Sequence, residues 1–184
     1  MTVNPVDDFV RMLLERHAGP HTRVLDVGCG PAPYKKWIKG TYIGLDITDA
    51  PYGPGIPRRV DIVGSAMALP LMSSSVDLVF SKSALYQVLD PDGALREFRR
   101  VLRDGGRLLL VDYNRGAQRR IQIAERAVRP CWTQWELRSH LKLAEFKQCE
   151  LIVPTSKRVG AFEGGVRLLY QELFGTWAIV TGVK

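Results

Sequence analysis

The sequence of 184 residues has few cysteines and no long hydrophobic run. Its three cysteines, Cys29, Cys131 and Cys149, stand at unrelated spacings, which argues against a disulfide framework and against a zinc site. No apolar stretch approaches the roughly 20 residues of a membrane span, and the N-terminus lacks the basic and apolar regions of a signal peptide. These absences indicate a cytoplasmic protein with reduced thiols, no transmembrane segment and no metal centre.

What is present is the composition of one folded domain. The hydrophobic content of 46% and the charged content of 24% are ordinary, and the length predicts a single domain over residues 1–184. The net charge of +7 would suit acidic partners such as nucleic acid or anionic lipid. A moderate basic excess spread over surface helices more often serves solubility, so nucleic acid is the less favoured partner.

One stretch has the form of a ligand-binding loop. The apolar run Arg23–Val27, which contains Asp26, leads straight into Gly28-Cys29-Gly30. Glycines after a strand allow a positive φ and let a ligand approach the backbone. Pro31 and Pro33 lack the N–H groups with which such a loop holds a pyrophosphate, and the charge of Asp26 favours a cation. The loop therefore indicates a cationic ligand without phosphate rather than a dinucleotide.

This stretch resembles the first motif of the class I (Rossmann-like) S-adenosylmethionine-dependent methyltransferases, with Ala32 in place of the usual third glycine. Their cofactor carries a sulfonium and an α-ammonium group and no phosphate. Asp46 follows at about the 20-residue offset at which an acid meets a ribose diol. Gly64–Leu71 resembles the segment that flanks the adenine in this family, and Ser65 replaces the acid that usually stands there.

The resemblance implies a fold and a cofactor site. The fold is a seven-stranded α/β sheet of order 3-2-1-4-5-7-6, with strand 7 antiparallel and helices on both faces. The cofactor is S-adenosyl-L-methionine, and no metal is implied. Met67 would cover the adenine or simply fill the core. The implied cofactor-binding residues are Asp26, Gly28, Cys29, Gly30, Asp46, Ile47, Ser65, Ala66, Met67 and Ser81.

Apolar periodicity and capping signals predict the elements. The predicted helices run from Asn4-Pro5 to Gly19-Pro20, over Tyr34–Ile38, from the cap Asp90 to Gly105-Gly106, over Arg115–Arg129, and from the capping box Thr133–Glu136 to Leu143. The predicted strands are Arg23–Val27, Tyr42–Asp46, Val60–Val63, Val76–Ser81, Arg107–Val111, Cys149–Val153 and Thr176–Val183.

The connections carry two further expectations. Asp49–Arg59 is rich in proline and glycine and predicts a loop where the resembled family usually has a helix. The sheet face there would be thinly covered, so a homodimer is one expectation. Val159–Gly165, within the link Pro154–Gly175, is either a lid over the substrate or an ordinary connection.

Candidate catalytic residues stand near the ends of the fourth and fifth strands. Tyr86 and Tyr113 are the first candidates, although both suit a pocket wall equally well, and Asp112 and His17 are further candidates for a general base. The fourth strand ends in Ser-Lys-Ser-Ala, unlike the proline-rich motif of enzymes that methylate the exocyclic amines of nucleobases.

The predicted function is methyl transfer to a small or medium-sized acceptor such as a natural product, glycan or lipid intermediate. Two alternatives stay open. One is a catalytically weak cofactor-binding or partner protein of the same fold. The other is an RNA methyltransferase that uses its basic helices, although the face with Arg96, Arg99, Arg100 and Arg103 more often simply faces water.

Overall fold

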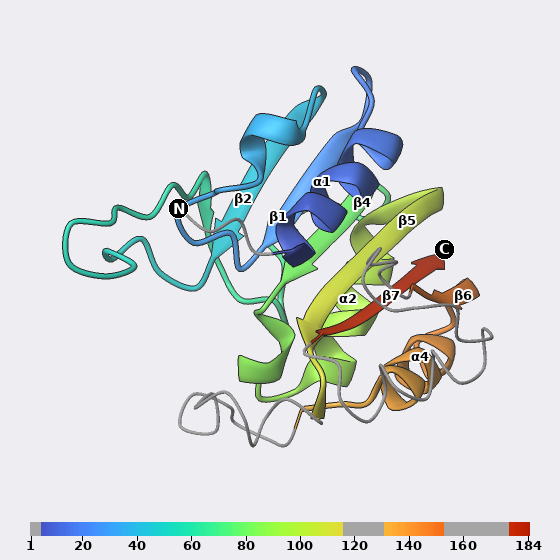
Figure 1. The fold of residues 1–184 in the computed structure, drawn as a ribbon. Helices are drawn as coiled ribbons and strands as arrows, with labels where there is room; N and C mark the ends of the chain where they lie inside the picture. Colours follow the sequence, from blue (N-terminus) through green and yellow to red (C-terminus); the bar gives the residue numbers. More distant parts are fainter. Residues whose placement is uncertain (1–4, 116–130, 153–176) are drawn as a thin grey trace.

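The computed structural model describes residues 5–115, 131–152 and 177–184. These residues form a seven-stranded sheet with helices on both faces (Figure 1). The strand order is β3-β2-β1-β4-β5-β7-β6, and β7 runs antiparallel between β5 and β6. The predicted fold class, including the strand order, is confirmed.

Most predicted elements are found with small changes at their ends. The strands are β1 Arg23–Val27, β2 Thr41–Asp46, β3 Ile62–Val63, β4 Val76–Lys82, β5 Leu102–Tyr113, β6 Lys147–Leu151 and β7 Trp177–Val183. The helices are α1 Pro5–His17, α2 Pro91–Val101 and α4 Gln134–Leu143, with single 3-10 turns η1 Lys35–Trp37 and η2 Leu85–Gln87. No described helix is long and apolar enough to cross a bilayer.

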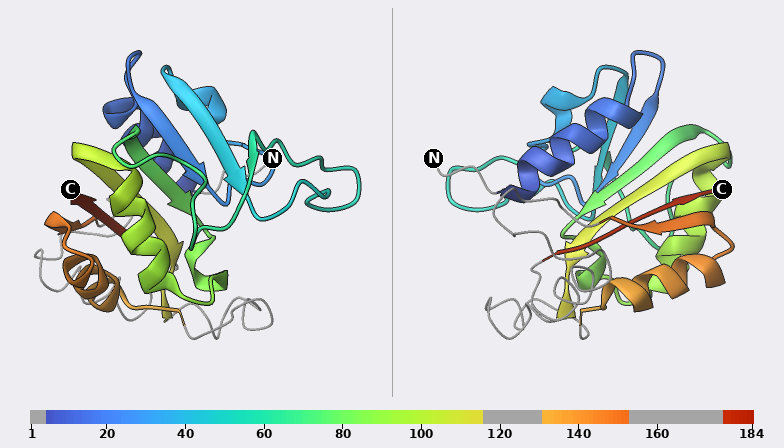
Figure 2. Two further views of the ribbon diagram at one scale, coloured as in Figure 1. Left: turned by 180° about the vertical axis from the view of Figure 1, so that it is seen from behind. Right: turned by 45° about the vertical axis from the view of Figure 1, so that its right-hand side comes forward.

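The central strands are apolar on both faces. Phe80 and Leu109 pack in the cluster that contains the α1 side chains, whereas Val79 and Leu108 pack in the cluster of α2 and α4. Successive strand residues point to opposite faces, and parallel strands covered by helices on both sides are expected to be apolar throughout. Figure 2 shows α1 on one face of the sheet and α2 and α4 on the other.

Two helix predictions are wrong in extent. The helix expected over Tyr34–Ile38 is only the single turn η1, closed by i→i+3 bonds such as that from the Trp37 N–H to the Tyr34 carbonyl. Helix α2 ends at Val101 instead of reaching Gly105-Gly106. The reason is that Leu102 is fully buried and pairs with Val76, so β5 begins there.

Other local predictions are confirmed. Asp90 caps α2 by accepting the N–H of Gly93 at 2.9 Å, and Thr133 and Glu136 form the predicted capping box of α4. Residues 49–59 form no helix. The predicted helix beyond residue 115 and the link 154–175 lie outside the described residues.

Candidate functional site

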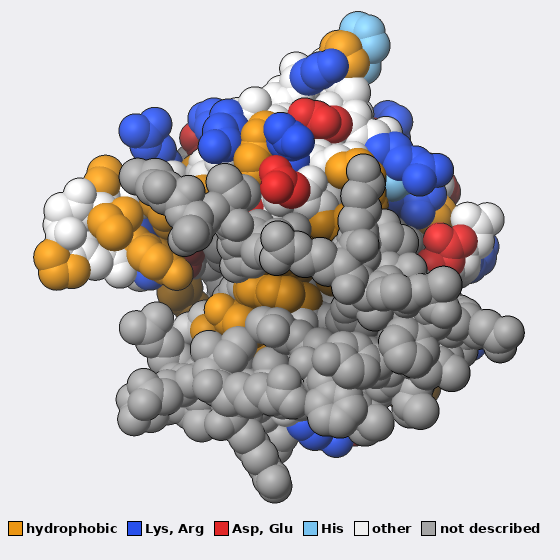
Figure 3. Space-filling model, viewed as in Figure 1, with side chains coloured by type: hydrophobic (Ala, Val, Ile, Leu, Met, Phe, Trp, Pro, Cys, Tyr) orange, Lys and Arg blue, Asp and Glu red, His pale blue; other side chains and the backbone are white. Residues whose placement is uncertain are grey.

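A large cavity of about 740 Å³ opens at the carboxyl ends of β1, β2 and β4. This volume is typical of a small-molecule site. The cavity lies where the strand order reverses between β1 and β4, which is where open parallel sheets bind their ligands. Figure 3 shows hydrophobic side chains on the projecting loop of residues 49–59 and a hollow beside it.

All ten residues expected at a cofactor site line this cavity, together with both candidate tyrosines. They are Asp26, Gly28, Cys29, Gly30, Asp46, Ile47, Ser65, Ala66, Met67, Ser81, Tyr86 and Tyr113. These residues come from five separate stretches of the chain, and only the fold brings them together.

The N–H groups of the glycine loop are bound within the protein. Gly28 and Cys29 both donate to the carbonyl oxygen of Leu45, at 2.8 and 3.1 Å. Gly30 donates to Oδ2 of Asp46 at 2.9 Å. These bonds hold the end of β1 to the end of β2.

The second half of the loop offers no donor either. The N–H of Ala32 donates to the carbonyl oxygen of Cys29 at 2.9 Å, and Pro31 and Pro33 have no N–H. A pyrophosphate would therefore find no unbound backbone donor between residues 28 and 33. Such donors are what a phosphate site at a helix N-terminus requires, so the loop geometry disfavours a phosphate ligand.

The first glycine is required by space as well as by conformation. Gly28 has a φ of +76°, and a Cβ built there would lie 2.4 Å from Cβ of Ala84. Ala32, at the usual third glycine position, has a φ of +54°. It tolerates a left-handed conformation that costs a residue with a Cβ about 1–2 kcal/mol.

Asp46 presents a buried carboxylate to the cavity. Its Oδ1 accepts the N–H of Ile47 at 2.8 Å, and its Oδ2 accepts the N–H of Gly30. Arg58, from the loop after β2, donates to the same Oδ2 at 2.5 Å. A ligand diol at Asp46 would meet a carboxylate that is already positioned by the backbone and shared with one guanidinium.

Asp26 is a second buried carboxylate, 2% exposed, and it also faces the cavity. Burial raises the pKa of Asp26 to about 7, and the negative charge of Asp46 also raises it. The hydroxyl of Tyr42 donates to Oδ2 of Asp26 at 2.8 Å and lowers the pKa in part. A cationic ligand would favour the ionised form of Asp26.

The remaining cofactor candidates differ in how much of their side chain is engaged. Ser81 is buried and donates its hydroxyl to the carbonyl oxygen of Val27 at 3.0 Å. Ser65 accepts the N–H of Met67 at 3.1 Å. Met67 is 37% exposed, so the alternative that it fills the core is wrong.

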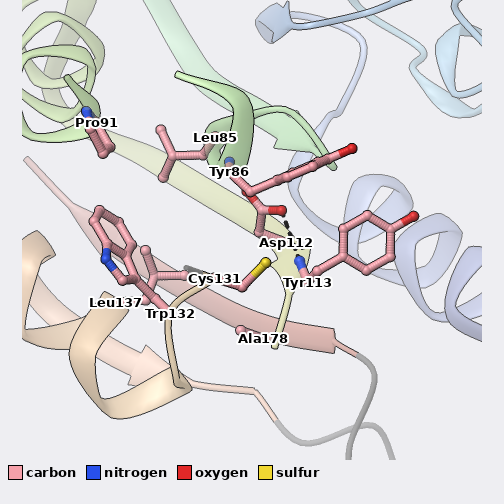
Figure 4. A pocket seen from close by; sticks show the side chains of 9 residues that line it. All are labelled: Leu85, Tyr86, Pro91, Asp112, Tyr113, Cys131, Trp132, Leu137 and Ala178. Atoms are coloured by element: carbon pink, nitrogen blue, oxygen red, sulfur yellow. Dashed lines mark hydrogen bonds between the residues drawn. The ribbon is translucent and has the colours of Figure 1, made fainter. Parts of the chain in front are cut away.

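The two candidate tyrosines are held by one buried acid (Figure 4). Oδ2 of Asp112 accepts the N–H of Tyr86 at 3.0 Å, and Oδ1 accepts the N–H of Tyr113 at 2.8 Å. Burial raises the pKa of Asp112 to about 7, against these backbone hydrogen bonds. The rings meet edge to face at 5.3 Å and project away from Trp132 and Leu137. Both tyrosines border the large cavity and a smaller one beside it.

His17 is wrong as a candidate base. It does not line the cavity. Burial lowers its pKa most, and the positive charges of Arg107 and Arg16 lower it further. Arg107 pairs with Leu78 toward the amino ends of β4 and β5, so His17 lies at the opposite edge of the sheet from the cavity.

Sequence analysis missed Tyr42, which donates to Asp26 from outside the cavity lining, and two cations that line the cavity, Arg58 and Lys82. The signal for Tyr42 was available: Asp26 pairs with Gly44, which has no side chain, and Tyr42 lies two residues earlier on the same face. No signal existed for Arg58, because its loop has no periodicity. Lys82 extends β4 by one residue beyond its predicted end and lines the cavity.

The fold and the cavity define a Rossmann-like α/β protein with a ligand site at the carboxyl ends of its strands. Comparison with known proteins agrees. The family described as "Methyltransferase domain" matches residues 25–110. Residues 25–110, a little under half of the chain, match this methyltransferase family, and the fold is that of the class I S-adenosylmethionine-dependent methyltransferases.

Individual relatives show the breadth of this family. The malonyl-[acyl-carrier protein] O-methyltransferase of Methylococcus capsulatus is 34% identical over 125 residues, covering 61% of this chain and 46% of that protein. The ubiquinone/menaquinone biosynthesis C-methyltransferase of Acidiphilium cryptum is 32% identical over 70% of this chain and 53% of its own length. The chain thus spans about half the length of these curated relatives.

A solved structure matches over nearly the whole chain. The S-adenosylmethionine-dependent methyltransferase of Mesorhizobium loti superimposes with a TM-score of 0.71 at 18% identity and covers 99% of both chains. At that identity the likeness shows the fold alone.

Proposed function

We propose that this protein binds S-adenosylmethionine in the large cavity and transfers its methyl group to a small or medium-sized acceptor. The observation that carries the proposal is the pairing of two buried carboxylates, Asp26 and Asp46, with a glycine loop whose N–H groups are all engaged. That combination suits a ligand with a diol and a positive charge and without a phosphate.

Each lining group has a role in this proposal. Asp46 accepts hydrogen bonds from the two ribose hydroxyls, and Asp26 faces the α-ammonium group. Gly28 and Gly30 let the ligand approach the backbone, with Cys29 between them and Ser81 behind. Ile47, Ser65, Ala66 and Met67 flank the adenine, and the exposed side chains of Ile47 and Met67 are available to cover its two faces.

Methyl transfer from this cofactor requires the protein mainly to position the acceptor. When bound, the cofactor supplies an activated methyl group on a sulfonium, and the acceptor must lie in line with it in a desolvated site. Tyr86 and Tyr113 border the cavity beside Ser81 and are fixed through Asp112. In the proposal their hydroxyls and rings orient the acceptor, and they act as the catalytic residues.

A small acceptor is favoured over RNA by the contacts of the four arginines on α2 and at the start of β5. Arg100 donates to the carbonyl oxygens of Leu69 and Leu71, so it braces the segment beside the cavity and does not face water as expected. Each of the four arginines also pairs with a carboxylate: Arg96 with Asp90, Arg99 with Glu145, Arg100 with Glu97 and Arg103 with Asp77. The names of the two relatives above likewise concern a malonyl carrier and a quinone.

The proposal also includes a homodimer through the free edge of β3. Two exposed apolar side chains are Val63, in β3 itself, and Ile56, in the loop that leads into β3. Unpaired strand edges are templates for pairing. Light scattering that gives the mass of a monomer at high protein concentration would refute the dimer.

Two measurements test the main proposal. Calorimetry of the full chain with S-adenosylhomocysteine should show one site. Incubation with methyl-labelled S-adenosylmethionine and a metabolite extract should then move label to a small molecule. Binding without transfer would support the catalytically weak alternative, and the absence of binding would contradict the proposal.

A further inference from the structure

Lys82 is a partly buried cation at the end of β4, next to Ser81. Its side chain is 13% exposed, and it lines the large cavity. Its Nζ lies 4.4 Å from the ring centroid of Trp177 and 5.5 Å from that of Tyr34. Two aromatic rings, one of which also lines the cavity, therefore flank the ammonium group, which offsets part of the cost of removing it from water.

No described carboxylate fully satisfies this ammonium. The nearest is Asp7, whose Oδ1 lies 3.8 Å away, beyond hydrogen-bond distance. The same oxygen already accepts the hydroxyl of Tyr34 at 2.8 Å. Arg58 is the only other cation among the described residues that line the cavity, and it is bound to Asp46. Of these two cations, Lys82 is therefore the one whose ammonium N–H groups have no carboxylate within hydrogen-bond distance among the described residues.

Several aromatic rings lie near Lys82. Tyr34, Tyr86 and Tyr113 line the same cavity, and Tyr113 stacks on Trp177 with ring centroids 4.6 Å apart. A planar apolar group would find rings to pack against on this side of the cavity.

We infer that Lys82 binds a carboxylate of the methyl acceptor, and that the acceptor carries this carboxylate on a planar apolar group packed against Tyr86 and Tyr113. A single negative charge suits this place better than a dianionic phosphate, because Asp26, Asp46 and Asp112 already bring three buried carboxyl groups to the cavity and its border. The inference names the acceptor class for the function proposed above and rests on that function.

A purely structural role is the competing explanation. The contact with Asp7 would then only fasten α1 to β4. The two explanations differ in one observable: a fastening residue affects stability, whereas a binding residue affects the choice between a charged and a neutral ligand of the same shape.

Benzoate and benzamide are such a pair of probes, because they share a planar ring and differ in charge. The experiment measures the binding of each to the full chain saturated with S-adenosylhomocysteine, by ligand-observed NMR titration. We expect benzoate to bind about tenfold or more tightly than benzamide. In Lys82→Met this preference should disappear while the affinity for S-adenosylhomocysteine stays within about twofold.

Lys39→Met is the matched control, because Lys39 is exposed and does not line the cavity. It should keep the benzoate preference. Equal binding of the two probes, absence of benzoate binding, or a preference that survives in Lys82→Met would each overturn the inference. Failure to bind S-adenosylhomocysteine at all would instead overturn the proposed function. Thermal unfolding of Lys82→Met shows separately how much the contact with Asp7 stabilises the fold.

Discussion

Replacing the acid at the end of β2 is the sharpest perturbation of the proposed ribose site. In Asp46→Asn the side chain keeps its shape and one acceptor oxygen but loses its charge. In the native structure both carboxylate oxygens already accept backbone N–H groups, from Ile47 at 2.8 Å and from Gly30 at 2.9 Å. The amide nitrogen of the asparagine must therefore face a donor on one side.

The expected magnitude follows from these contacts. A hydrogen bond to a charged group contributes about 1.5–3 kcal/mol, and the ribose would lose the charge-assisted part of two such bonds. We expect a loss of about 2–3 kcal/mol in the free energy of cofactor binding, which is about 30- to 150-fold in the dissociation constant.

Calorimetry with S-adenosylhomocysteine and its 2′-deoxy analogue makes the assignment specific. The native protein should prefer the ribose ligand, and Asp46→Asn should lose most of that preference. Asp49→Asn is the control, because Asp49 is exposed in the same segment and does not line the cavity; its affinity should stay within about twofold. An Asp46→Asn variant that binds both ligands as the native protein does would refute the reasoning.

Three further predictions concern the loop and its charge. Gly28→Ala should cost about 1–3 kcal/mol of stability and weaken cofactor binding, because the new Cβ meets that of Ala84. Gly55→Ala is the control: Gly55 also has a positive φ but lies in open space, so this variant measures the backbone strain alone. Equal losses of stability in urea unfolding would contradict the clash with Ala84. Asp26, with a pKa of about 7, should make cofactor affinity rise as the pH passes upward through about 7, because the cation binds its ionised form; calorimetry across this range with an Asp26→Asn control checks it, and a flat native profile would count against the assignment. Ala32→Gly should stabilise the fold by about 0.5–1 kcal/mol, because glycine adopts the left-handed conformation without strain. A lower urea midpoint would contradict this, since it would show that the entropy gained by the unfolded chain outweighs the strain removed.

The parts of the fold and of the site that could be predicted from the sequence were those marked by residues close together in the chain. The glycines, the prolines and Asp26 occupy consecutive positions, so their joint meaning for a ligand could be read without the fold. Asp46 was found by its offset from the loop, because β1 and β2 are parallel neighbours and their carboxyl ends meet at one edge. The strand order came from the resemblance to a family rather than from the physical properties of the residues.

Contacts between distant, aperiodic segments could not be predicted. Arg58 reaches Asp46 from a loop of prolines and glycines that has no register. Lys82 lies between Tyr34 and Trp177, which are far from it and from each other in the chain. The early end of α2 depended on Leu102, whose burial in β5 outweighs the glycine signal that follows it. Such choices are settled by tertiary packing.

The central claim is that this cavity binds an adenosine ligand that carries an α-ammonium group and no phosphate. A parallel titration of the full chain with S-adenosylhomocysteine and with NAD⁺ tests it most directly, because both ligands carry an adenosine and only NAD⁺ carries a pyrophosphate. The structure predicts saturable binding of S-adenosylhomocysteine at one site, and no binding of NAD⁺ at the same concentrations, because residues 28–33 have no unbound N–H to offer it. Tighter binding of NAD⁺, or no binding of S-adenosylhomocysteine, would contradict the claim.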